Sequence, residues 1–190
     1  MIRDPFMQIG ISNRDDLSGK DSGVSGAGRS SDPKFLYAER DGNCEAYKVG
    51  YAHRHVPEME QEASAAAGQG VQITFVPHLL PMVRGILATC YATAGAKVAG
   101  KDIENAYRKH YGKEQFVRIS PHDGLPSTKE VSGSNFCDVA CRFDGKSRRV
   151  IAVSAIDNLV KGASGSAVQC FNLMMGFPED EGLRSAPFFP

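Results

Sequence analysis

The sequence has no excess of charge of either sign, since Lys plus Arg and Asp plus Glu each number 22. A balanced chain does not offer the broad basic surface that nucleic acids or anionic membranes require, so we expect neither as a partner. A small anionic substrate needs only a local positive patch and is compatible with this composition. Tryptophan is also absent, and nothing in the sequence explains why.

Long hydrophobic runs are missing as well. No uninterrupted apolar stretch reaches the length of about 18 residues that a membrane-spanning helix needs. The first residues are acidic and polar at the place where a signal peptide requires an apolar centre. We therefore expect a cytoplasmic protein.

The five cysteines form no CxxC pair, and no His-rich metal spacing accompanies them. Their number is odd, so a complete set of disulfides is not expected. The sequence therefore predicts reduced, mostly buried thiols and no metal site. The cysteines are Cys44, Cys90, Cys137, Cys141 and Cys170.

What the sequence does contain is enough for one domain with a real core, because 190 residues include 42% hydrophobic side chains. Apolar periodicity predicts helices and strands in mixed order, with antiparallel pairs, which is the α+β class. The expected helices are residues 58–67, 101–111 and 159–175. The expected strands are residues 35–37, 46–49, 71–76 (ended by Pro77), 86–94 and 116–119, with a hairpin of residues 135–143 and 148–155 around the turn at residues 144–146.

The densest chemistry lies in residues 52–59, which hold two imidazoles, a guanidinium and a carboxylate. Histidine titrates near neutrality, so His53 or His55 is a candidate acid/base, and Glu58 is placed to orient an imidazole. Pro57 and Glu58 also suit the first turn of a helix. A charged loop that caps a helix therefore accounts for the same residues, and the sequence does not separate the two interpretations.

Two other places offer groups for an anion. Residues 22–29 form a Gly/Ser loop in which the backbone can approach a ligand closely, and Arg29 at its end suits a phosphate or carboxylate. Arg84 lies between two expected strands. The alternatives are a flexible turn for the loop and a buried structural role for Arg84.

Four segments, taken in order, resemble one family. They are residues 22–29 (SGVSGAGR), 53–58 (HRHVPE), 76–87 (VPHLLPMVRGIL) and 155–169 (AIDNLVKGASGSAVQ), with residues 172–176 (NLMMG) extending the last. Together they look like the C-terminal part of the N-acetyl-gamma-glutamyl-phosphate reductases, aspartate-semialdehyde dehydrogenase-like enzymes of arginine biosynthesis. Each segment alone is weak evidence, whereas four in the family order are specific.

The resemblance implies a glyceraldehyde-3-phosphate dehydrogenase-like C-terminal domain, with a mostly antiparallel sheet and helices on one face. In the family, an N-terminal Rossmann domain binds NADP and carries the nucleophilic Cys in an Asn-Pro-Gly-Cys turn. This sequence has neither that turn nor a glycine-rich phosphate loop. We therefore expect a chain that is inactive alone, and a separate Rossmann half as its complement. The expected parts are an irregular leader (1–21), a substrate-binding and dimerisation domain (22–157), and a helix and tail that pack on a Rossmann domain (158–190).

The resemblance also implies roles for single residues in the NADP-dependent reduction of an acyl phosphate to an aldehyde by a homo-oligomer. His53 aligns with the family's catalytic His, and the preceding turn differs from the family's Gly-Gly, which leaves His55 as the alternative. Substrate contacts come from Ser22, Ser25, Gly26, Arg29 and Arg84, and cofactor contacts from Asn158, Lys161, Gly162 and Gly165. Where the family has Lys before Ser-Gly, this sequence has Asp21, with Lys20 one position earlier.

Three other functions are consistent with parts of the sequence. The first is a non-catalytic dimerisation or regulatory module that kept the fold. The second is a reductase of a related acyl phosphate, although the balanced charge offers no basic surface for a carrier protein. The third is a small hydrolase that uses Cys90, although nothing basic adjoins Cys90 in sequence to lower its pKa.

Overall fold

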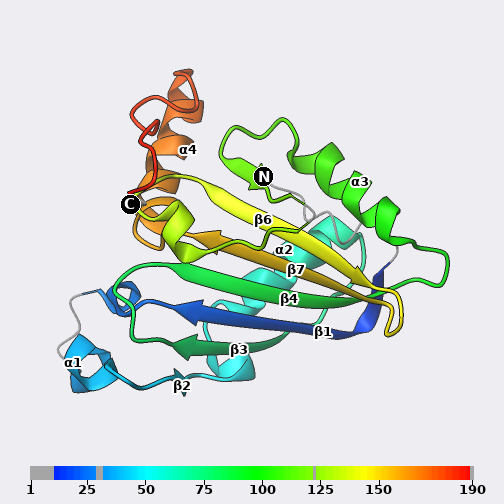
Figure 1. The fold of residues 1–190 in the computed structure, drawn as a ribbon, viewed down its shortest axis with the longest axis horizontal. Coiled ribbons are helices and arrows are strands. Elements are labelled where there is room, and N and C mark those ends of the chain that lie inside the picture. The colour runs from blue at the N-terminus through cyan, green and yellow to red at the C-terminus, as the bar shows by residue number, and fades with distance from the viewer. Residues whose placement is uncertain (1–10, 29–31, 122, 189–190) are drawn as a thin grey trace.

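The centre of the molecule is a seven-stranded mixed sheet, seen in a computed structural model that describes residues 11–28, 32–121 and 123–188 (Figure 1). The strand order is β2-β3-β1-β4-β7-β6-β5. The strands are β1 (Ile11–Ser22), β2 (Glu45–Ala46), β3 (Thr74–Leu79), β4 (Ile86–Ala94), β5 (Val117–Ile119), β6 (Cys137–Asp144) and β7 (Arg149–Ile156).

Most strand pairs in this sheet are antiparallel. β1 runs parallel to β3, and β5 runs parallel to β6. The other pairings, β2 with β3, β1 with β4, β4 with β7 and β6 with β7, are all antiparallel. The predicted α+β class and mostly antiparallel sheet are therefore confirmed.

The helices are α1 (Tyr37–Arg40), α2 (Val56–Ala67), α3 (Gly100–Tyr111) and α4 (Gly165–Met175), with short 3-10 turns at Val24–Ala27, Pro33–Phe35, Gly50–Ala52 and Thr128–Val131. Helix starts follow their sequence signals: Pro57 lies in the first turn of α2, and the Asp102 carboxylate accepts the Ala99 N–H at the start of α3. α2 and α4 end at Gly68 and Gly176, which adopt positive φ angles of 69° and 74°.

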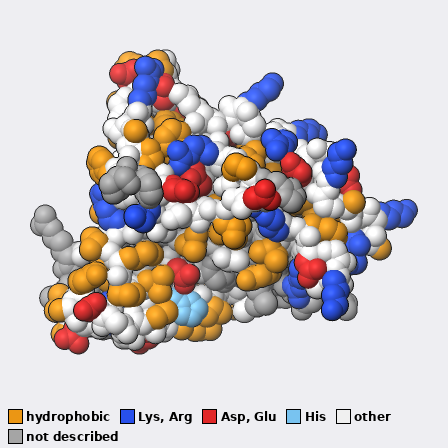
Figure 2. All heavy atoms as spheres, viewed as in Figure 1, with side chains coloured by type: hydrophobic (Ala, Val, Ile, Leu, Met, Phe, Trp, Pro, Cys, Tyr) orange, Lys and Arg blue, Asp and Glu red, His pale blue; other side chains and the backbone are white. Residues whose placement is uncertain are grey.

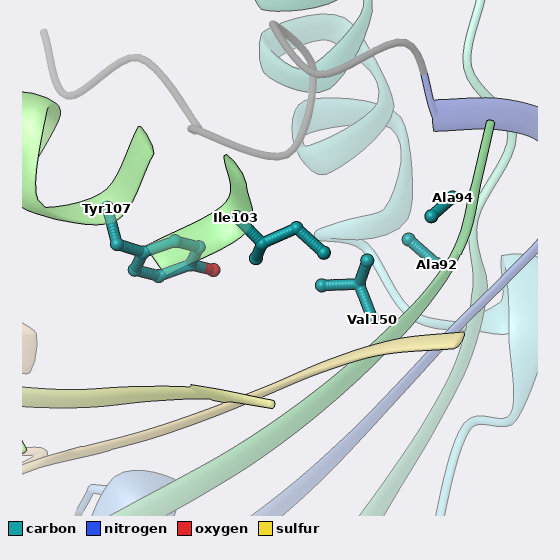
Figure 3. Close-up of a cluster of buried hydrophobic side chains, with 5 residues drawn as sticks. All are labelled: Ala92, Ala94, Ile103, Tyr107 and Val150. Atoms are coloured by element: carbon teal, nitrogen blue, oxygen red, sulfur yellow. The ribbon is translucent and has the colours of Figure 1, made fainter. Parts of the chain in front are cut away.

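Helices α2 and α3 lie on the same side of the sheet. The apolar core cluster joins Ile103 and Tyr107 of α3 to Ala92, Ala94 and Val150 of the sheet (Figure 3). Residues that pair across neighbouring strands have their side chains on the same side of the sheet. The register therefore places the side of β4 that carries Ala92 and Ala94 on the same face as the buried side of β3, with β1 between them. The segment that leads into α2 packs on this side of β3. Figure 3 shows α2 behind α3 on the same side of the strands.

The opposite side of the sheet, here called the open face, faces the viewer in Figures 1 and 2. Hydrophobic side chains gather over the middle of the sheet in Figure 2. Tyr91 of β4 and its register partner Ile151 of β7 lie on this face, and Tyr91 is 39% exposed. No described helix covers these strands on this side, because α2 and α3 occupy the other.

The prediction of an irregular leader over residues 1–21 is wrong for residues 11–21. They form most of β1, which lies between β3 and β4 in the sheet. The polar run at residues 13–16 suggested a break, but it coincides with a register irregularity between Ser12 and Leu17 in the β1–β4 pair, and the strand continues past it. Residues 1–10 lie outside the described residues, and the division at residue 158 stays a prediction.

Other differences from the expected elements are local. Pro77 lies inside β3 rather than at its end. The N and C=O of one residue in a strand point toward the same neighbouring strand. The Pro77 carbonyl accepts the N–H of Tyr47, which lies just beyond the two-residue strand β2, so the nitrogen of Pro77 also points toward β2 and away from β1. Pro77 therefore removes no hydrogen bond to β1. The strand expected at residues 46–49 stops at Ala46, because Lys48 adopts a φ of 45°.

The two ends of the chain also differ from expectation in detail. Residues 35–37 join a 3-10 turn to α1 and form no strand. The helix expected over residues 159–175 begins with a π-helical turn, Val160–Ser164, before α4. There the N–H groups of Gly162 and Ser164 each bond to a carbonyl five residues earlier.

None of the helices in the described ranges has the length and apolar character that crossing a bilayer requires.

Candidate functional site

Three chain segments meet at one end of the sheet, where the arrowheads of β1, β3 and β7 point in Figure 1. We call this place the loop junction, and it consists of residues 22–28, 80–85 and 157–158. The backbone N–H groups of Gly23, Val24 and Ser25 donate to the carbonyls of Gly85, Met82 and Val83 at 2.9, 3.0 and 3.2 Å. A Cβ at position 23 would lie 2.8 Å from the Val83 carbonyl oxygen, so glycine permits this close approach.

The side chain of Asn158 links the three segments of the loop junction. Its Oδ1 accepts the Gly85 N–H, and its Nδ2 donates to Ser25 Oγ, both at 2.8 Å. Gly26 lies beside them, since a Cβ there would be 3.4 Å from Ser22 Oγ and 3.8 Å from Asn158 Nδ2. The structure thus brings Ser22, Ser25, Gly26 and Asn158 together. Asn158 is only 6% exposed and already holds two partners.

Arg84 is held by a structural carboxylate at the same junction. Asp157 is fully buried, and its Oδ2 lies 3.5 Å from Arg84 Nη1 and accepts the Gly133 N–H at 2.7 Å. Its Oδ1 accepts the N–H groups of Leu159 and Val160 at 2.8 and 3.1 Å. Asp157 therefore fixes the start of the π-helical turn, and Arg84 remains partly exposed beside it.

His53 lies away from the loop junction, against the helix-covered side of β3. Its ring centre is 5.0 Å from that of Phe75 and 5.7 Å from that of Tyr47, in edge-on contacts. Nδ1 of His53 accepts the backbone N–H of His55 at 3.3 Å. Because an acceptor nitrogen carries no proton, the neutral ring carries its proton on Nε2.

The surroundings of His53 favour its neutral form. Burial is the main reason that the pKa of His53 is lowered, since the side chain is 7% exposed. The charges of His55, Lys20, Lys48 and Arg54 lower this pKa further, in that order. A chain without net charge therefore still places a local positive patch around His53.

His55 and Glu58 contribute less to this arrangement. The His55 ring centre is 4.9 Å from that of His53, and His55 precedes the first residue of α2. Glu58 is exposed in the first turn of α2. Within residues 32–121, no hydrogen bond or ion pair joins Glu58 to either imidazole, so its position matches the helix-capping alternative.

The remaining residues expected at the cofactor do not form one surface. Lys161 Nζ donates to Gln169 Oε1 at 2.6 Å and lies 5.4 Å from the centre of the Phe116 ring. It lines a separate cleft of about 580 Å³ between β5, the end of α3 and α4. Gly165 is buried, and a Cβ there would lie 2.3 Å from Asn135 Oδ1. Gly162 continues the π-helical turn.

Neither Cys137 nor Cys90 is set up as a nucleophile for His53. Burial raises the pKa of Cys137 to about 11, which disfavours the thiolate. Cys90 lies on the helix-covered side of β4, two strands away from β3, or roughly 10 Å at the usual strand spacing. Arg29 is outside the described residues.

Sequence reasoning missed Lys20 and Asp157. Lys20 stands one position from the family pattern, so a comparison of motifs does not select it, although strand alternation puts residues 20 and 22 on the same side. Asp157 lay within a resembling segment, but only the structure reveals that a buried carboxylate there accepts three backbone N–H groups.

The mixed sheet, the loop junction and the His53 segment define a class of protein. A family described as "Semialdehyde dehydrogenase, dimerisation domain" matches residues 4–158, and the chain belongs to this family of oxidoreductases. A dimerisation domain supports a homo-oligomer. Among solved structures, aspartate semialdehyde dehydrogenase II from Vibrio cholerae has a TM-score of 0.68 at 16% identity, over 90% of this chain and 57% of that one. The enzyme from Francisella tularensis reaches 0.64 at 10% identity, over 90% and 60%. These likenesses show the fold.

The particular relatives are named N-acetyl-gamma-glutamyl-phosphate reductase. The chain is 52% identical over 169 residues to that of Geotalea daltonii, and 51% over 174 residues to that of Geobacter sulfurreducens. It is 46% identical over 188 residues to that of Lachnospira eligens. These matches cover 89%, 92% and 98% of this chain but 49%, 50% and 54% of the relatives. The chain thus spans about half the length of the curated relatives it matches, and the resemblance seen in the four segments is confirmed.

Proposed function

We propose that this chain is the substrate-binding and dimerisation part of an NADP-dependent N-acetyl-gamma-glutamyl-phosphate reductase. In this role it acts in arginine biosynthesis, with a Rossmann half that supplies the cofactor site and the nucleophilic cysteine. The observation that carries the proposal is His53, which lies in a segment resembling the family's catalytic motif. It is buried and kept neutral by its neighbours, and its unprotonated Nδ1 is the basic atom.

His53 is the proposed acid/base of the reaction. Nδ1 of His53 exchanges its 3.3 Å hydrogen bond with the His55 N–H for the proton of the attacking thiol. The thiolate then forms a thioester with the acyl carbon, and phosphate leaves. The same imidazole returns the proton to the oxygen of the reduced carbon before the aldehyde is released. A neutral base is required at the start of this sequence, and the lowered pKa of His53 supplies one at neutral pH. His55 and Glu58 then serve to place the segment.

The loop junction is the proposed substrate contact, through Ser22, Ser25 and Gly26, with Arg84 at its edge. Arg29 follows the junction in the sequence and is proposed as a further substrate contact. A nicotinamide cofactor would supply the hydride that this reduction consumes. Of the residues expected to hold it, Asn158 lies at the junction, whereas Lys161 lines another cleft and Gly165 is packed against Asn135. The described residues alone do not make a nicotinamide site, so we place most cofactor contacts, including the choice of NADP, on the Rossmann half.

The direct test is phosphate-dependent reduction of NADP with N-acetylglutamate semialdehyde, followed at the absorbance of the reduced cofactor. The purified chain is assayed alone and after addition of a Rossmann half that carries the Asn-Pro-Gly-Cys turn. We expect activity only in the mixture, and loss of at least about a hundredfold with His53→Asn, the usual size of an acid/base contribution. His55→Asn is the matched control and retains most activity.

Three other results would each favour a different function. Activity of the chain alone that disappears with Cys90→Ser would identify Cys90 as a nucleophile. Self-association without activity in the mixture would favour a non-catalytic dimerisation module. Activity in the mixture only with a different acyl phosphate would favour the related reductase.

A further inference from the structure

Lys20 lies on the same side of the sheet as His53, although its sequence position departs from the family pattern. In the register of the sheet, Lys20 pairs with Pro77 of β3 and with Ala88 of β4. Pro77 is buried on the side of β3 that carries Phe75, the ring that contacts His53. The neighbouring Asp21 points to the open face, where its carboxylate lies 3.7 Å from His78 Nδ1.

Lys20 is partly withdrawn from water and has no anionic partner within the described residues. Its side chain is half-buried, and burial lowers its pKa. A lysine that buries its methylene stem keeps its ammonium accessible, so the head group of Lys20 can pair with an anion from solution. The charges that act on His53 from this region are all positive, so the patch lacks the counter-charge that a bound anion would provide.

Lys20 also stands between the two parts of the proposed site. In the register of β1 and β3, Ser22 is level with Leu79, four residues beyond Phe75. At the usual rise per residue this separates the His53 level from the loop junction by roughly 13 Å. Lys20 lies midway, and the flexible side chain of a lysine can extend toward either end.

We propose that Lys20 holds the phosphate group of the acyl phosphate next to His53. This inference rests on the proposed function and names the residue that recognises the leaving group. The phosphate is attached to the carbon at which His53 would act, so a cation beside His53 meets that phosphate rather than the remote end of the substrate. An ammonium is a point charge that suits a phosphate, and it also stabilises the charge gained as phosphate leaves.

The test uses inorganic phosphate and the 190-residue chain, with the imidazole of His53 followed by NMR and assigned from the spectrum of His53→Gln. A phosphate bound beside His53 raises the pKa of its imidazole, relative to chloride at equal ionic strength. We expect this shift in the parent chain and in Lys20→Arg, which keeps the charge. In Lys20→Met we expect the shift to be lost, with phosphate affinity weaker by about tenfold or more.

Lys48→Met is the matched control, since Lys48 is exposed and its charge also lowers the pKa of His53. Both methionine variants should raise the starting pKa of His53, but only Lys20→Met should abolish the response to phosphate. The proposal is overturned if phosphate causes no shift in the parent chain, or if the shift persists in Lys20→Met, or if Lys48→Met abolishes it equally.

This measurement does not depend on turnover. Suppose that phosphate raises the pKa of His53 as expected but the chain stays inactive with every Rossmann half. The phosphate site at Lys20 would then be supported, and the proposed reaction would be rejected. Activity in the mixture that is unchanged by Lys20→Met, with unchanged dependence on phosphate concentration, would reject the role of Lys20 and leave the reaction in place.

Discussion

Among single residues, His53 couples the stability of the fold to pH. An unfolded histidine has a pKa of about 6.5, and burial followed by neighbouring positive charges lowers the pKa of His53 in the folded chain. Well above pH 6.5 both states are neutral at this residue, so its contribution is fully present. As the pH falls below about 6.5, the unfolded state binds the proton first, and stability is lost toward the lower folded pKa.

We therefore predict that the free energy of unfolding of the parent chain falls as the pH is lowered from about 7 to 5, and that His53→Gln falls less steeply. Urea denaturation at a series of pH values measures both slopes. The slope for Lys48→Met should lie between those of the parent chain and His53→Gln, because this variant removes one of the charges that lower the pKa of His53. Equal slopes for the parent and His53→Gln would contradict this account.

On the scale of an element, two glycines of the last helical segment differ in the space that they leave for a side chain. A Cβ at Gly165 would meet Asn135 Oδ1 at 2.3 Å and the Val160 carbonyl oxygen at 2.8 Å, so α4 can approach the sheet only without a side chain there. At Gly162 the nearest atoms would be 3.4 and 3.5 Å away, which is ordinary contact.

We predict that Gly165→Ala destabilises the chain by about 1–3 kcal/mol, the usual effect of overpacking. Gly162→Ala should be neutral or stabilising by up to about 1 kcal/mol, because alanine restricts the unfolded chain. Urea denaturation of the two variants at one pH measures the difference. Similar free energies of unfolding for the two variants would show that the structure accommodates a Cβ at position 165 beside Asn135.

The elements that the sequence predicted are those with a local cause. The hairpin β6–β7, strand β4 and helix α3 each carry their own periodicity and turn residues. β1 was missed because its polar run is tolerated only through pairing with β3 and β4, which lie far along the chain. The π-helical turn was missed because Asp157 sets it through backbone contacts that no pattern records.

The candidate site shows the same limit. The motifs located His53 and the Gly/Ser loop, but their separation along β3 depends on strand register. Sequence order suggested one cofactor surface for Asn158 and Lys161, whereas the π-helical turn directs Lys161 into another cleft. The roles of these residues in catalysis and binding stay predictions.

For the whole molecule, the open face of the sheet is the expected contact between copies of the chain. Family membership supports dimerisation, and Tyr91 lies on a face that no described helix covers. Helix α4 offers an alternative surface, because it projects from the end of the sheet in Figure 1 and Met174 is 84% exposed.

We predict that Tyr91→Arg weakens self-association by about tenfold or more, because a charge at a two-fold contact faces its own copy. Met174→Arg on α4 should leave self-association unchanged. Sedimentation or light scattering across a range of concentrations measures both. If Met174→Arg weakens self-association and Tyr91→Arg does not, the contact between copies lies on α4.

The central position of β1 has a consequence for how the chain acquires its structure. The first described strand is held on one side by β3 and on the other by β4, so its hydrogen bonds close only after much of the chain has been synthesised. Such long-range pairing slows folding. Until β4 emerges from the ribosome, β1 keeps an open edge that other chains can join, which is the kind of exposed edge that favours aggregation.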